Sequence, residues 1–144
     1  MVITMLVLGI MAAVTLPRFL QSLDHYRADA AARQLQADLQ LAQRTARTTG
    51  SAESISFDVT GHRYSFSSLA DPNRGANVYT VDLADAPYYC SLSTVAFADR
   101  PSITFDGYGF PNAAGKITVA SGDEVRTLTL DGATGQILVV GDEP

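Results

Sequence analysis

Side chains that could carry out acid–base or metal chemistry are scattered along the chain. His25 and His62 fall in different expected elements, and Asp24 cannot form a catalytic dyad with His25, because neighbouring residues on a helix point in different directions. The sequence contains no Gly-x-Ser-x-Gly motif, no phosphate-binding loop and no Cys/His spacing typical of a metal centre. We therefore expect a protein that is not an enzyme, without catalytic residues or a cofactor.

Several acidic residues fall in expected loops and at the ends of expected strands, a distribution typical of a solvated surface. A calcium site, which needs several oxygen ligands around one ion, is the alternative interpretation. The set comprises Asp71, Asp82, Asp85 and Asp99.

The chain has one cysteine, Cys90, so no intramolecular disulfide can form. Its neighbours Tyr88 and Tyr89 favour a packed position, in which the thiol acts as a small buried side chain. A reactive or intermolecular thiol is the alternative.

Two arginines, Arg44 and Arg47, are candidates for ligand binding, because a spacing of three places them on one face of an expected helix. Near a helix C-terminus, cations are also favoured by the helix dipole alone. Other side chains that could bind or stack on DNA are Arg63, Arg74, Tyr64, Tyr79, Tyr88 and Tyr89. The net charge of −5 disfavours DNA as a partner, since DNA binding relies on clustered cations.

An apolar segment, residues 1–17, opens the chain and contains no charge before Pro17. Its length lies at the short end of what a bilayer span requires. A cleaved secretion signal fits less well, because no basic residue precedes the apolar run and the run continues beyond Ala12 and Ala13. The segment therefore predicts a membrane anchor.

Residues 18–50 continue this segment as an amphipathic helix, since they contain neither Gly nor Pro before Gly50, a residue suited to end a helix. An early apolar stripe runs through Phe19, Leu23, Tyr26 and Ala30. A later stripe is out of phase with the first, and we expect it to pack on a sheet. It comprises Ala28, Ala32, Leu35, Leu39, Ala42 and Ala46.

A continuous helix through both segments would have about 48 residues and a length of about 70 Å. A domain of this size cannot bury such a helix, so half of it must project into a membrane or an assembly. Pro17 is expected to kink the helix or loosen one turn.

Beyond Gly50 the hydrophobic period changes to two, which predicts short strands separated by glycine turns. A loop is expected at 67–76, and the pattern does not assign a secondary structure to 88–95. The expected strands are 54–59, 62–66, 78–83, 103–105, 116–120, 124–130 and 136–140. The sequence thus predicts an α+β fold, in which a long N-terminal helix packs on a small antiparallel β-sandwich or sheet domain, residues 51–144.

Three stretches resemble type IV pilin-like proteins, and the last two resemble the H-type minor pseudopilins of type II secretion, the GspH/FimT family. They are VITMLVLGIMAAVTLPRF, AARQLQADLQLAQRTARTTG and ITFDGYGFPNAAGKITVASGDEVRTLTLDGATGQILVV. Thr134, Gly135, Gln136 and Ile137 stand where the family has a "TG-x-hydrophobic" strand. The resemblance covers roughly 100 residues at both ends of the chain, and 67–100 match no part of the pattern.

The sequence departs from the family pattern at two places. Family precursors begin with a basic leader that is cut before a methylated Phe, and a Glu follows early in the mature chain. We expect the leader and the first mature residues to precede Met1, in a longer precursor that prepilin peptidase processes. Gln136 stands where the family often has Arg, which further disfavours DNA binding.

The resemblance implies a structural assembly subunit with a pilin-like fold. Its apolar helix would hold it in the bacterial inner membrane as a single span, with the β-rich domain in the periplasm, and would later pack among other pilins in the core of a filament. The residues expected to do so are Leu6, Gly9, Ile10, Ala12, Ala13, Leu16 and Pro17.

We therefore predict a minor pseudopilin or minor pilin, at or near the tip of a type II secretion pseudopilus or a type IV pilus. Type II secretion, pilus and competence filaments share this helix, so the sequence does not distinguish among them. One alternative is a DNA-uptake or adhesive minor pilin that binds DNA or a surface ligand. Another is a membrane-anchored β-domain unrelated to pilins.

Overall fold

The computed structural model describes the backbone of residues 2–72, 75, 77–98 and 100–141, and the side chains of these residues except 4 and 6–19. Helix α1 (Val2–Thr49) comes first, and eight strands follow it in the described part of the chain. The strands are β1 (Glu53–Asp58), β2 (Arg63–Ala70), β3 (Val78–Asp82), β4 (Ser91–Phe97), β5 (Ser102–Phe105), β6 (Gly115–Ser121), β7 (Glu124–Leu130) and β8 (Ile137–Gly141).

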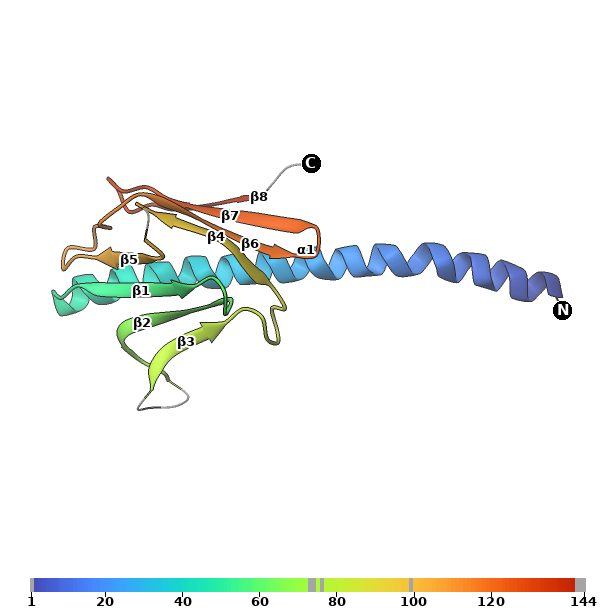
Figure 1. The fold of residues 1–144 in the computed structure, drawn as a ribbon, viewed down its shortest axis with the longest axis horizontal. Coiled ribbons are helices and arrows are strands. Elements are labelled where there is room, and N and C mark those ends of the chain that lie inside the picture. Colours follow the sequence, from blue (N-terminus) through green and yellow to red (C-terminus); the bar gives the residue numbers. More distant parts are fainter. Residues whose placement is uncertain (1, 73–74, 76, 99, 142–144) are drawn as a thin grey trace.

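Helix α1 is a single element of 48 residues that continues through Pro17 and ends one residue before Gly50. The predicted length and end of the helix are confirmed. Figure 1 shows that the C-terminal half of α1 lies along the strands, whereas its N-terminal half extends away from them. The helix therefore has one half inside the β-rich domain, which we call the head, and one half outside it.

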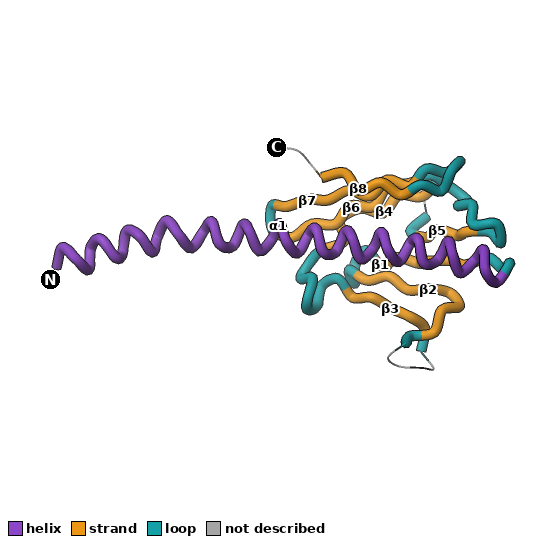
Figure 2. The backbone as a smooth tube through the Cα atoms, turned by 180° about the vertical axis from the view of Figure 1, so that it is seen from behind, coloured by secondary structure: helices purple, strands orange, loops and turns teal. Residues whose placement is uncertain are grey.

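The strands form two antiparallel sheets of four, in the orders β3-β2-β1-β5 and β4-β6-β7-β8. The chain leaves the first sheet after β3, forms β4 in the second, returns to the first as β5, and completes the second with β6, β7 and β8. Figure 2 shows α1 crossing in front of both sheets. The helix and the returning strand β5 thus connect the two sheets.

All seven expected strands are present, but two other predictions need correction. The loop expected at 67–76 is wrong in its first part, because β2 continues to Ala70, which pairs with Val78 beyond a bulge. This part of the strand was not predicted because Ser67 and Ser68 are both polar and exposed, so the alternation of apolar and polar residues stops there. The unassigned stretch 88–95 contains the start of β4, which adds the eighth strand.

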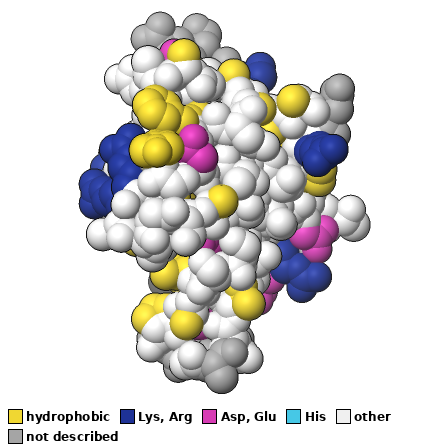
Figure 3. Space-filling model, turned by 90° about the vertical axis from the view of Figure 1, so that its left-hand side faces the viewer, with side chains coloured by type: hydrophobic (Ala, Val, Ile, Leu, Met, Phe, Trp, Pro, Cys, Tyr) yellow, Lys and Arg dark blue, Asp and Glu magenta, His cyan; other side chains and the backbone are white. Residues whose placement is uncertain are grey.

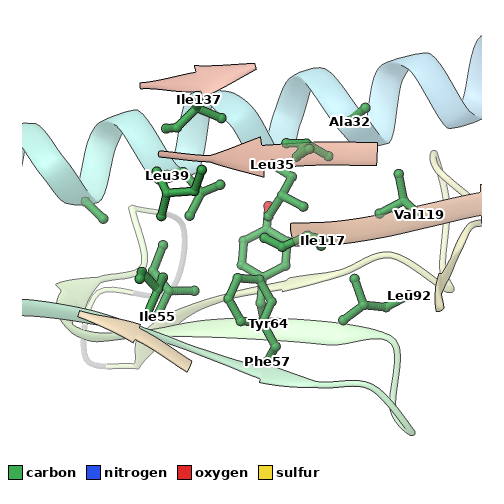
Figure 4. Packing of buried hydrophobic residues seen from close by; sticks show 14 of the residues in the cluster. Ala32, Leu35, Leu39, Ile55, Phe57, Tyr64, Leu92, Ile117, Val119 and Ile137 are labelled. Carbon is green, nitrogen blue, oxygen red and sulfur yellow. The ribbon is translucent and has the colours of Figure 1, made fainter. Parts of the chain in front are cut away.

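The core is one cluster to which the helix and both sheets contribute (Figure 4). The ring of Phe57 on β1 lies 5.8 Å from the ring of Tyr64 on β2 and 5.9 Å from that of Phe97 on β4. Phe57 therefore joins the two sheets. Leu35 and Leu39 on α1 are 0% and 1% exposed and fill the space between the sheets.

We expect Leu35→Ala to lower the free energy of unfolding by about 2–5 kcal/mol, because it removes a fully buried side chain and leaves a cavity. Leu41→Ala is the matched control on the same helix, since Leu41 is 39% exposed, and it should cost less than half as much. Urea denaturation followed by circular dichroism measures both. Equal losses for the two variants would contradict this account of the helix–sheet contact.

Candidate functional site

The later apolar stripe of α1 fixes the helix in the head. Its residues are 0–1% exposed, and α1 contacts β1, β5, β6, β7 and β8. Four of the six are alanines, whose small side chains let the backbone of the helix approach the sheets closely. The stripe comprises Ala28, Ala32, Leu35, Leu39, Ala42 and Ala46.

A buried carboxylate, Asp38, lies within this apolar contact and is 4% exposed. The hydroxyl of Tyr64 donates to its Oδ2 at 2.5 Å, and Nε2 of Gln34 donates to the same atom at 3.1 Å. Burial raises the pKa of Asp38 above its ordinary value of 3.8, although these bonds partly offset the effect. Burial likewise raises the pKa of Tyr64 well above 10.0. Because a buried polar pair tolerates little misalignment, it sets the rotation of α1 against β2.

The hairpin formed by β6 and β7 contacts the helix where it leaves the head. Arg126 on β7 is 6% exposed, and its Nε donates to Oδ1 of Asp29 on α1 at 2.8 Å. Its Nη1 donates to Oε2 of Glu124 at 3.2 Å, and its Nη2 lies 2.8 Å from Nδ1 of His25. Arg33 also pairs with Asp29, at 3.4 Å. We call His25, Asp29, Glu124 and Arg126 the hairpin clasp.

Within the clasp, the guanidinium of Arg126 and the carboxylates of Asp29 and Glu124 stabilise one another's charges. The hydrogen bond from Arg126 holds the pKa of Asp29 below its ordinary value of 3.8. The hydrogen bond with His25, and then that from Arg126, lower the pKa of Glu124 below 4.5. His25 thus belongs to a contact with β7, which the sequence analysis missed because the partners lie about a hundred residues away.

A second contact of the same turn involves Asp24, which accepts a hydrogen bond at 3.2 Å from the hydroxyl of Ser121. Arg27 pairs with Asp24 at 3.6 Å, and its guanidinium lies 4.9 Å from the centre of the Tyr89 ring. These contacts surround α1 at the boundary between its buried and projecting halves.

The described apolar side chains of the projecting half are exposed: Val2 is 80%, Ile3 78%, Met5 73% and Leu20 59% exposed. Of the early stripe, Leu23 and Ala30 are half-buried and Tyr26 is 73% exposed, whereas the side chain of Phe19 is not described. The side chains of the predicted anchor residues also lie outside the described set, although their backbone is helical. These are Leu6, Gly9, Ile10, Ala12, Ala13, Leu16 and Pro17.

Within the part of the chain whose side chains the structure describes, no helix is long and apolar enough to cross a membrane.

At the other end of the head, Arg47 lies beside the loop between β5 and β6. Its Nε donates to the carbonyl oxygen of Tyr108 at 3.0 Å, and Arg44 is exposed one turn earlier on the helix. Tyr108 and Phe110 in this loop are 79% and 49% exposed. The sequence analysis did not identify these two rings as surface candidates, although the Gly-containing turn around them indicates an exposed loop.

The other candidates for DNA binding have separate structural roles. Arg63 pairs with Asp58 at 3.0 Å, Tyr64 is buried against Asp38, and Arg74 lies outside the described residues. Tyr79 and Tyr88 are half-buried and pack against the core. The structure thus does not bring the described members of this set to one surface.

No group of three or more His, Cys, Asp or Glu side chains is placed to hold a metal ion within the described part of the chain; Asp99 is not described. Cys90 is 3% exposed, and its thiol donates to the carbonyl oxygen of Tyr88 at 3.2 Å. Burial raises the pKa of this thiol, so it is a packed, protonated side chain, as the sequence predicted. The ring of His62 accepts a hydrogen bond from the backbone of Leu92 at 3.1 Å.

Comparison with known proteins gives one family and several similar folds. The family described as "Type II transport protein GspH" matches residues 31–135. No curated protein sequence matches the chain.

Among solved structures, the minor pseudopilin EpsH from the type 2 secretion system of Vibrio cholerae is 15% identical, with a TM-score of 0.63 over 82% of this chain and 99% of that one. The type IV minor pilin FimU of Pseudomonas aeruginosa is 24% identical in one crystal form, with a TM-score of 0.57 over 81% of this chain and 88% of that one. These similarities confirm the predicted pilin-like fold.

The raised pKa of Asp38 predicts a specific pH dependence of stability. Because the folded state holds the proton more tightly than the unfolded state, the contribution of Asp38 to stability falls as pH rises from 3.8 through the raised pKa. Asp38→Asn cannot ionise, so its free energy of unfolding should rise relative to the unaltered chain from about pH 4 to about pH 7. Urea denaturation at several pH values measures the difference.

Asp29→Asn is the matched control, because the pKa of Asp29 is lowered and its contribution has the opposite sign. The stability difference between this variant and the unaltered chain should be nearly constant from about pH 4 to about pH 7, and should shrink below pH 4, where the unaltered chain loses stability as Asp29 is protonated. A pH-independent difference for Asp38→Asn would contradict the assigned role of its carboxylate.

Proposed function

The chain belongs to the GspH family of type II transport proteins, and we propose that it is a structural subunit at or near the tip of a filament. Membership makes it a minor pseudopilin or minor pilin, of type II secretion or of type IV pili, and removes the alternative of a β-domain unrelated to pilins. One observation supports the assembly role above others: α1 is fixed in the head by its C-terminal half and extends away from it by the rest (Figure 1).

A projecting apolar helix requires an environment that covers it. Pseudopilins of this family are anchored in the inner membrane and face the periplasm, and we propose the same for this chain, with 1–17 as the span. Residues 18–50 would connect the span to the periplasmic head, residues 51–144. In a filament, neighbouring helices would replace lipid at little cost, because both environments are apolar, and Gly9, Ala12 and Ala13 would permit close approach.

Its partners would be other pilins, and the full-length precursor would be a substrate of prepilin peptidase and of methylation. The family is a structural one, which supports a role without catalysis. A minor subunit occurs in few copies, so a position that exists once in a filament, such as the tip, suits it better than a repeated one. EpsH and FimU, which share its fold, are both described as minor subunits.

Cysteine cross-linking tests whether the projecting half packs among other helices. The single native cysteine is buried, so Leu20→Cys would supply one reactive thiol on α1 outside the head. We expect it to cross-link in cells to a cysteine introduced at the facing position on the N-terminal helix of another filament subunit. The control, Thr129→Cys on the exposed surface of β7, should not react with that helix. Absence of the Leu20→Cys cross-link in cells that assemble the filament would contradict the proposal.

Deletion of residues 1–16 tests the division between anchor and head. Since the described core begins at Ala28, we expect the shortened chain to be soluble and to unfold in urea at the same concentration as the full chain in detergent. It should fail to enter filaments, because it lacks the apolar half of the helix. An insoluble or unfolded product would show that the head depends on the deleted residues.

A further inference from the structure

The loop between β5 and β6 exposes two aromatic rings at the end of the head opposite the projecting helix. Tyr108 is 79% exposed and Phe110 is 49% exposed. We call residues 106–111 the distal aromatic loop. Figure 3 looks onto this end of the head, where hydrophobic side chains lie next to Lys and Arg side chains and also beside an Asp or Glu side chain.

Internal hydrogen bonds hold the distal aromatic loop rigid. Oδ1 of Asp106 accepts from the backbone N–H of Tyr108 at 3.0 Å and of Phe110 at 2.8 Å. The backbone N–H of Asp106 donates to the carbonyl of Phe110 at 2.9 Å, and that of Gly109 donates to the carbonyl of Asp106 at 2.8 Å. The rings are therefore displayed on a fixed backbone, which reduces the entropy that binding would cost.

The C-terminal end of α1 packs against the distal aromatic loop and donates hydrogen bonds to it. Nε2 of Gln43 donates to the carbonyl of Gly109 at 2.8 Å, next to the bond from Arg47 to Tyr108. Gly109 has a φ of +82°, and a Cβ there would lie 2.2 Å from Nε of Arg47; at Gly107 a Cβ would lie 2.6 Å from the carbonyl oxygen of Gly50. Both positions require glycine, so the loop and the helix end fit each other at van der Waals contact.

The guanidinium groups beside the rings form no ion pair with a carboxylate among the residues that the structure describes. No hydrogen bond or ion pair joins the side chain of Arg44 to another described residue, and the side chain of Arg47 donates to the carbonyl oxygen of Tyr108. Asp106 caps its own loop, and Asp131 accepts from the backbone of Ala133 and Thr134 in a neighbouring turn. The surface thus combines two exposed rings with two guanidinium groups on a chain whose net charge is −5.

We propose that the distal aromatic loop, with Arg44 and Arg47, is the docking site for another filament subunit, one that presents carboxylates beside an apolar pocket. The proposal rests on the filament function proposed above. Aromatic and Arg side chains dominate the binding energy of protein interfaces, and cations without an ion-pair partner complement an acidic partner. Because the loop lies at the opposite end of the head from the projecting helix, both contacts can form at once (Figure 1).

A nucleic acid fits this surface less well than a protein does. Two arginines can neutralise few phosphates, whereas nucleic-acid binding relies on many clustered cations. A protein partner needs only a few carboxylates, and its apolar side chains can pack against both rings.

Photo-cross-linking of the full-length chain in its native cells tests the proposal. With p-benzoylphenylalanine in place of Phe110, we expect a covalent product with a different subunit of the filament, joined near an Asp or Glu. Arg44→Glu should reduce this product about fivefold or more, whereas Arg44→Lys, which retains the charge, should leave it within about twofold. Tyr108→Ala should also reduce it, without changing the urea unfolding midpoint, because its ring is exposed.

The Leu20→Cys cross-link serves as the internal control for assembly. If that cross-link forms and position 110 gives no product, or gives products only with DNA or with a second copy of this chain, the docking proposal is wrong and the filament function stands. If neither cross-link forms, both proposals are wrong. A product at position 110 that Arg44→Glu leaves unchanged would also overturn the proposed acidic partner.

Discussion

Burial of one stripe of α1 against both sheets is the constraint on which the rest of the structure depends. Each sheet has only four strands and exposes an apolar face that the other sheet alone does not cover. The helix closes both faces at once, because its alanines allow a close approach and Leu35 and Leu39 fill the space between the sheets. The same contact leaves the other half of the helix uncovered, since the strands end before the helix does.

Polar contacts then determine how the helix lies within the head. Asp38 and Tyr64 set its rotation in the interior, where a misaligned carboxylate would lose its hydrogen bonds without gaining water. The hairpin clasp acts at the boundary, where the largely buried Arg126 joins Asp29 on α1 to Glu124 on β7. Both contacts join α1 to the strands, so the direction in which the helix leaves the head is coupled to the packing of the sheets.

In a subunit built in this way, the placement of the projecting helix also determines the placement of the opposite end of the head. The helix, held at the boundary by the clasp, ends against the distal aromatic loop through Gln43 and Arg47. A rigid connection therefore runs from the projecting helix to the exposed rings of Tyr108 and Phe110. This arrangement suits a protein that contacts the filament core at one end and another subunit at the other, which is the role proposed for it.

The sequence by itself determined the length of the helix, its buried stripe, the positions of seven strands and the family. These features depend on local periodicity, on glycine positions and on short motifs, all of which act between residues close together in the chain. The tertiary structure alone decided the contacts of His25, Asp38 and Glu53. Glu53 accepts hydrogen bonds from Ser67 and Ser68, which lie in the part of β2 that the hydrophobic pattern did not predict. Such contacts depend on the order of strands in the sheets and on the return of β5, because these bring together side chains as much as a hundred residues apart.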